Sequence, residues 1–119
     1  EKYGYEIYGN GKIELEFLYK RRRLELILKQ EGFDTSLYDF DLLAYNKKFD
    51  LFLYKEVGYA LLNDLVNGLF SSAYGATSLR EYFANGFEEY YLGDKSYLRT
   101  ISYNLYDAIN NLHTMDHQT

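Results

Sequence analysis

The chain has no cysteine, no proline and no tryptophan, and its two histidines, His113 and His117, both lie near its C-terminal end. Without cysteine it has no disulfides, no thiol nucleophile and no thiolate metal ligand. With histidine confined to one end, it offers no credible Ser-His-Asp set. The i, i+4 spacing of His113 and His117 is that of a metal-binding pair. Because they follow the last apolar position of a predicted helix, we expect two exposed histidines instead.

The sequence also lacks long apolar runs and an excess of basic residues. Runs such as 50–54 are far shorter than the ~20 residues of a membrane span. Eighteen acidic and 13 basic residues give a net charge of −5, which argues against wrapping nucleic acid. The one basic cluster, Lys20 to Arg23, predicts a solvated turn or helix end. No stretch has the pattern of a signal peptide. Since the sequence begins at Glu1, we expect a processed product or an excised piece of a larger protein.

Aromatic residues are abundant, with 15 tyrosines and 8 phenylalanines among 119 residues. A tyrosine ring is apolar at its body and polar at its tip, so we expect many rings at core edges or in contact surfaces. The length predicts one domain, residues 1–119, that buries roughly two-thirds of its unfolded surface.

The first half of the chain predicts strands. Residues 5–8, the Gly9-Asn10-Gly11 turn and residues 12–19 form a predicted β-hairpin. Its second strand alternates apolar and polar positions, with Ile13, Leu15, Phe17 and Tyr19 on one side. Residues 21–31 fit a helix that ends at Gly32, although their leucines also alternate, and we favour the helix. Residues 37–45 predict another strand.

The second half predicts helices. Apolar residues recur at helical spacing over 50–68, 78–92 and 95–112. A Ser/Gly loop separates the first two, and Gly93-Asp94 separates the last two. The expected fold class is α+β, with a small, mostly antiparallel sheet packed against three helices.

Two fragments indicate a site. Lys55-Glu56-Val57-Gly58-Tyr59 keeps the glutamate of a His-Glu-x-x-His zinc helix but has Lys55 and Tyr59 where the histidines would stand. Tyr74 and Glu81 follow seven residues apart, ahead of a Phe-rich helix. These fragments resemble the zincin-like domain of the anthrax lethal factor family, which the Pro-Pro endopeptidases share. The resemblance implies that Glu56 stands at the general-base position, Tyr74 at the catalytic tyrosine and Glu81 at a zinc ligand.

The departures from that pattern argue against metal binding. The Lys55 ammonium repels Zn²⁺, the Tyr59 phenol has an ordinary pKa near ~10 and is a poor ligand, and Glu81 alone cannot hold the ion. We therefore expect no metal, no cofactor and no active catalytic residue. Lys55 either replaces the zinc charge beside Glu81 and Tyr74 or is a solvated helix residue. Glu81 is either a former ligand or the third residue of a helix whose N-cap is Ser78.

The resemblance is to the degenerate, non-catalytic copy of the domain that lethal and edema factors contain, which docks on a carrier pore protein. It implies a pseudo-metallopeptidase module of a toxin or secreted factor that binds another protein, such as a carrier or a host protein. One alternative is a structural or assembly component, such as a phage virion protein. Another is a diverged peptidase that uses Glu56 and Tyr74. We expect a secreted or virion-associated protein with a protein partner, no nucleic acid and no membrane span.

Overall fold

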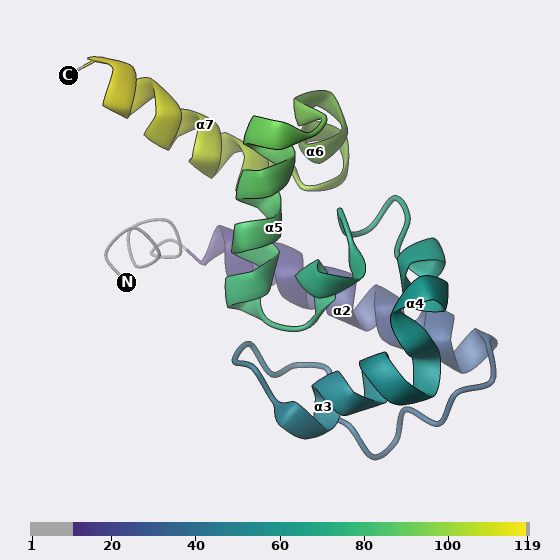
Figure 1. Ribbon diagram of the computed structural model, residues 1–119. Helices are drawn as coiled ribbons and strands as arrows, with labels where there is room; N and C mark the ends of the chain where they lie inside the picture. Colours follow the sequence, from purple (N-terminus) through teal and green to yellow (C-terminus); the bar gives the residue numbers. More distant parts are fainter. Residues whose placement is uncertain (1–10, 119) are drawn as a thin grey trace.

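The structure, a computed structural model, describes residues 11–118 and the surroundings of side chains 11–115 (Figure 1). Within these residues it contains helices and loops and no strand. The elements are α2 (Lys12–Gln30), α3 (Lys47–Leu51), the π-helical η1 (Phe52–Gly58), α4 (Tyr59–Leu65), the 3-10 turn η2 (Ala73–Ala76), α5 (Leu79–Leu92), α6 (Lys95–Ile101) and α7 (Tyr103–Gln118). The predicted α+β class, with its antiparallel sheet, is therefore wrong.

The predicted hairpin strand at 12–19 is the first half of α2. Of its alternating residues, only Ile13 and Phe17, four positions apart, are buried, whereas Leu15 and Tyr19 are 69% and 62% exposed. The Leu, Lys, Arg and Glu residues that continue to Gln30 favour helix, and the segment joins that longer helix. The helix predicted over 21–31 is thereby confirmed as its second half. The predicted strand 5–8 lies outside the described residues.

The predicted strand at 37–45 is part of the loop between α2 and α3. Asp34 and Asp39 each accept a backbone N–H two residues later, at 3.0 and 2.9 Å. Such local bonds replace the ladder bonds that a strand would make. Phe40 is buried in the core while Leu37 is 64% exposed. The alternating apolar residues therefore do not form one buried face, as they would in a strand of a sheet.

The helices of the second half follow the sequence more closely. Ser78 is the N-cap of α5, and its Oγ accepts the backbone N–H of Glu81 at 3.1 Å. The break at Gly93-Asp94 is confirmed, with Asp94 capping α6. The single helix predicted over 95–112 is divided at Ser102 into α6 and α7. The helix predicted over 50–68 is divided at Gly58, where φ is 85°.

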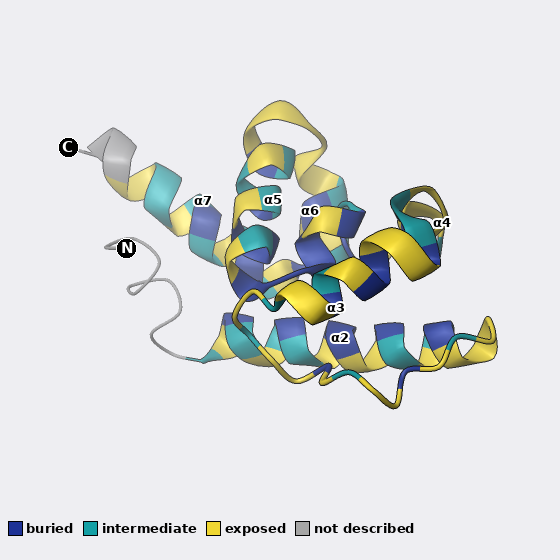
Figure 2. Cartoon of the chain, turned by 60° about the horizontal axis from the view of Figure 1, so that its bottom comes forward, coloured by how far each residue is buried: buried dark blue, intermediate teal, exposed yellow. Residues whose placement is uncertain are grey.

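The helix α2 lies along one side of the other helices (Figure 2), and two of its charged residues are buried with the core. Its buried residues recur at helical spacing and comprise Ile13, Phe17, Lys20, Arg21, Leu24 and Leu28. Lys20 is 3% exposed and Arg21 is 1% exposed. The prediction that the basic cluster is solvated is wrong for these two residues, and it holds for Arg22 and Arg23.

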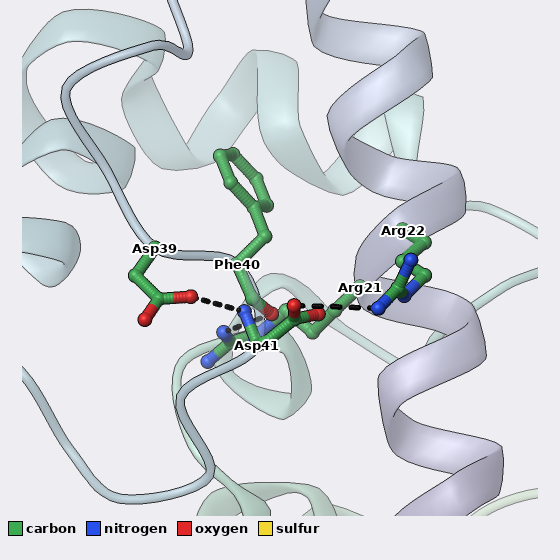
Figure 3. Close-up of polar contacts among 5 residues, drawn as sticks. All are labelled: Arg21, Arg22, Asp39, Phe40 and Asp41. Atoms are coloured by element: carbon green, nitrogen blue, oxygen red, sulfur yellow. Dashed lines mark hydrogen bonds and ion pairs between the residues drawn. The ribbon is translucent and has the colours of Figure 1, made fainter.

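Arg21 joins α2 to two separate loops through its guanidinium group, and Figure 3 shows its contact with Phe40 of the first loop. It donates to the carbonyl oxygens of Phe40 and Leu42, both at 3.2 Å, in the α2–α3 loop. It also donates to the carbonyl oxygens of Ala76 at 2.6 Å and Thr77 at 3.0 Å, at the end of η2. Four carbonyl groups thus obtain donors that the loops themselves do not supply.

Two phenylalanine rings enclose the same guanidinium group. Its central carbon lies 4.7 Å from the ring centre of Phe17 and 4.3 Å from that of Phe49. Burial lowers the pKa of Arg21 to about 10, and the charges of Asp39 and Asp41 partly oppose that shift. Arg21 therefore remains charged at neutral pH, held by carbonyl dipoles and ring faces.

Glu16 and Lys20 join α2 to the last three helices. The Glu16 carboxylate accepts the Tyr82 hydroxyl at 2.6 Å and the backbone N–H groups of Asn104 and Leu105 at 2.8 and 3.2 Å. It thereby satisfies the first turn of α7, where a negative charge is favourable. Lys20 donates to the carbonyl oxygens of Leu69 and Ile101.

Replacing Arg21 tests its role in stability. We expect Arg21→Met to lower the free energy of unfolding by about 3–5 kcal/mol, because four carbonyl groups lose a buried charged donor. The exposed neighbour provides the matched control: Arg23→Met should change it by less than about 0.5 kcal/mol. Urea unfolding followed by circular dichroism measures both. Equal effects of the two substitutions would contradict the buried role.

Lys20 should make stability depend on pH. Burial lowers the pKa of Lys20 from 10.5 to about 8, although the charge of Glu16 raises it somewhat. Between these values the unfolded chain binds more protons than the folded chain. The free energy of unfolding should therefore rise with pH above 8, by up to about 1.4 kcal/mol per pH unit.

Urea unfolding at pH 7.5, 8.5 and 9.5 measures this slope. The neutral amine still has two N–H donors for its two carbonyl partners, so deprotonation removes the cost of a buried charge and keeps the contacts. Lys20→Met should remove the rise, and the exposed Lys29→Met should keep it. If the free energy of unfolding depends on pH equally in the wild type and in Lys20→Met, Lys20 is not the residue that causes the rise.

Candidate functional site

The structure distributes the five predicted site residues over three neighbouring places. Lys55 and Glu56 line one hollow, Tyr59 contacts Tyr74, and Glu81 lines a second hollow with Tyr74. The tyrosine pair and Glu81 are thus brought together through Tyr74, while Lys55 and Glu56 lie apart from Glu81.

The Lys55–Glu56 hollow measures about 250 Å³ and is bordered by Tyr38 and Phe52. The Tyr38 hydroxyl donates to Glu56 Oε2 at 3.0 Å. Lys55 is exposed, and within the described part of the chain it forms no ion pair with Glu56 or Glu81. The hypothesis that its ammonium replaces zinc beside Glu81 is therefore not supported, and Lys55 is a solvated residue.

The local backbone explains why Lys55 and Tyr59 do not form a ligand pair. An i, i+4 pair faces one side only in a regular α-helix. Here Phe52–Gly58 is a π-helical turn, and Gly58 has φ 85° and ψ 135° before α4 begins. A positive φ of this kind is one that glycine adopts at little cost. Among the side chains that the structure describes, residues 11–115, no group of three or more His, Cys, Asp or Glu is arranged to hold a metal ion.

Four tyrosines and one carboxylate form the most distinctive surface, which we call the tyrosine surface: Tyr45, Tyr54, Tyr59, Tyr74 and Asp50. The ring centres of Tyr54 and Tyr59 are 5.3 Å apart and those of Tyr59 and Tyr74 are 5.1 Å apart, both edge-to-face. Asp50 accepts the Tyr59 hydroxyl at 2.8 Å and the Tyr45 hydroxyl at 3.4 Å. Tyr45, Tyr54 and Tyr74 are each more than half exposed.

Tyr59 is the half-buried centre of this surface. Burial raises the pKa of its hydroxyl above the ordinary tyrosine value, and the hydrogen bond to Asp50 raises it further. Tyr59 is therefore a proton donor at all physiological pH values. Its donation to Asp50 orients that carboxylate, and its ring supports both Tyr54 and Tyr74.

Beside Tyr74 is a hollow of about 340 Å³, which we call the acidic hollow. It is lined by Ser72, Tyr74, Glu81, Ala84, Asn85 and Glu88. Among these described residues are two carboxylates and no cation. Gly75 makes this close approach of η2 to α5 possible, because a Cβ at that position would lie 2.9 Å from the Asn85 side-chain oxygen.

A third hollow, of about 650 Å³, is also lined by Glu81, together with residues that include Tyr45 and Arg80. Glu81 is therefore shared between two hollows, each bordered by one tyrosine of the tyrosine surface. Its backbone N–H is the group that Ser78 caps. The backbone of Glu81 thus takes part in the N-cap that the sequence predicted, while its side chain lines the two hollows.

Sequence reasoning missed Asp50, Tyr45, Tyr54 and Glu88. The only signal for them was the high tyrosine content, which predicted rings in contact surfaces but not which ones. Tyr59 and Tyr74 were placed in one site by the resemblance to the zincin-like domain, and they do contact each other.

Comparison with protein-family models, curated proteins and solved structures finds no match to this chain. The resemblance to the anthrax lethal factor family accordingly stays a prediction, without the sheet that it implied. Of the helices that the structure describes, none combines the length and apolar character that crossing a membrane requires.

The raised pKa of Tyr59 gives a direct test of this geometry. In protein labelled with ¹³C at the tyrosine ζ carbons, the signal lost in Tyr59→Phe identifies Tyr59. We expect it to titrate at a higher pH than free tyrosine, whose pKa is about 10. Asp50→Asn should shift that titration to lower pH. A Tyr59 signal that titrates like free tyrosine in both proteins would show that the hydrogen bond is absent.

Proposed function

We propose that this chain is a non-catalytic protein-interaction module whose tyrosine surface binds a positively charged segment of a partner protein. The observation that supports it most directly is the row of tyrosine rings around Asp50, three of them more than half exposed. Exposed tyrosine side chains in mutual contact supply large contact area at low conformational cost.

The charges beside the rings indicate the chemistry of the partner. Asp50 lies among the tyrosines, and Glu81 and Glu88 line the adjoining acidic hollow. A lysine or arginine side chain can stack on a tyrosine face and pair with a neighbouring carboxylate. The net charge of −5 adds long-range attraction for a basic partner.

The arrangement favours binding over hydrolysis. Glu56 and Tyr74, the residues that a diverged peptidase would use, line different hollows. Glu56 is moreover engaged by the Tyr38 hydroxyl. A general base and its catalytic partner have to reach the same bond of a substrate, and these two residues do not share a hollow.

Selection from a display library of random 12-residue peptides tests the proposal. We expect the enriched peptides to be rich in arginine and lysine. Their affinity for Tyr54→Ser/Tyr74→Ser should fall by tenfold or more, roughly the loss of one or two interface hot spots.

The control is Tyr103→Ser, which alters a tyrosine of α7 that is 56% exposed and lies outside the tyrosine surface. It should bind the selected peptides within about twofold of wild type. Enriched peptides without a basic bias, or equal losses in the control and in the double variant, would overturn the proposal.

A further inference from the structure

A second exposed apolar surface lies on α2, on the side that faces away from the core. Leu15, Tyr19 and Leu26 are 69%, 62% and 55% exposed. Their i, i+4, i+11 spacing places them on one stripe, opposite the stripe that Phe17 and Leu24 bury. Figure 2 shows the exposed edge of α2 along its whole length. Leucine side chains that are this exposed and lie in a row on a 19-residue helix indicate a surface that binds another molecule.

Basic residues predominate among the exposed charges on this side of α2. Within Lys12–Gln30, the exposed charged residues are all basic, namely Lys12, Arg22, Arg23 and Lys29, whereas the glutamates of the helix are only partly exposed. Arg22 pairs with Asp41 at 3.3 Å and Lys29 with Glu25 at 3.7 Å, both on the surface. Exposed pairs of this kind are weak and screened, so they leave the helix attractive to a carboxylate-bearing surface. We call the apolar stripe with these basic residues the outer α2 face.

The outer α2 face has the chemistry that the proposed function requires of a partner. It combines leucines and a tyrosine with arginine and lysine, while the tyrosine surface combines tyrosines with Asp50 and borders Glu81 and Glu88. Docking of the apolar face of an amphipathic helix on an apolar surface of a partner is a recurring mode of recognition. At ~1.5 Å per residue, the 19 residues of α2 span about 28 Å, more than the two ring-to-ring steps of 5.3 and 5.1 Å that lead from Tyr54 to Tyr74.

We propose that the outer α2 face of one copy docks on the tyrosine surface of a second copy. This inference rests on the proposed function and identifies its partner as the chain itself. The attraction is then local, between the basic residues of the outer α2 face and Asp50, Glu81 and Glu88, because two copies of net charge −5 repel each other at long range. The two surfaces belong to different elements, so the contact is head-to-tail and each bound copy leaves one surface of each kind open. Such contacts build chains of copies rather than closed dimers.

A mixing experiment tests this arrangement with two full-length variants. Tyr19→Glu/Arg23→Glu alters only the outer α2 face, and Tyr54→Lys/Tyr74→Lys alters only the tyrosine surface. All four positions are exposed, so both variants should keep the wild-type unfolding midpoint. Leu92→Glu, at a site on α5 that is 85% exposed, is the matched control.

Sedimentation velocity over a range of concentrations gives the outcome. We expect the mass of wild type and of Leu92→Glu to grow with concentration beyond a dimer. Each double variant alone should remain a 14.1 kDa monomer. Their equimolar mixture should stop at a 1:1 dimer, because one intact surface of each kind remains.

Three results would overturn the inference. They are a wild type that stays monomeric at every concentration, a wild type that stops at a dimer, and a mixture that remains monomeric. Basic peptides that bind the tyrosine surface of a monomeric wild type would preserve the proposed function and refute self-assembly alone. A mixture that forms the dimer while peptide selection shows no basic bias would preserve self-assembly and overturn the proposed binding of basic segments.

Discussion

The fold depends on one buried cation. Arg21 projects from the middle of α2 and donates to four carbonyl groups of two loops that are far apart in the sequence. One of these loops leads into α3 and the other into α5, and Leu79 at the start of α5 donates to Leu43 of the first loop at 2.8 Å. The loops are therefore held against α2 and against each other. Because α3 and η2 supply Asp50 and Tyr74, the tyrosine surface forms only when these loops are in place.

Two further charged residues of α2 hold α6 and α7 in the same way, by satisfying backbone groups of these helices. Glu16 satisfies the first N–H groups of α7, and Lys20 satisfies a carbonyl at the end of α6. Burying charged groups without direct ionic partners is costly unless every donor and acceptor is satisfied. The buried charges thus contribute less to stability than to the placement of α3, α5, α6 and α7 relative to α2. The opposite side of α2 stays exposed.

Sequence reasoning succeeded where local signals and tertiary packing agree. Ser78 followed by Glu81 predicted the start of α5, and Gly93-Asp94 predicted its end, because caps and breaks act within one turn. It failed at 12–19, where Ile13 and Phe17 fit a strand and a helix equally well and only packing decides. It also failed for Arg21, since a basic run is usually solvated and nothing local shows which carbonyl groups lack donors. In the site, the resemblance paired Tyr59 with Tyr74, whose rings are in contact, but the role that it implied for them and for Glu81 stays a prediction. Asp50 and Tyr54 carried no local signal, because only tertiary packing brings them to Tyr59.

The most direct measurement of this account is the exchange of guanidinium hydrogens with solvent, followed by NMR. If Arg21 is buried and donates its Nε–H to the Ala76 carbonyl oxygen at 2.6 Å, that hydrogen should exchange slowly, as core amides do. The Nε–H of the exposed Arg23 should exchange within the dead time of the experiment. An Arg21 Nε–H that exchanges as fast as that of Arg23 would contradict the account, because the loops would then lack the group that holds them to α2.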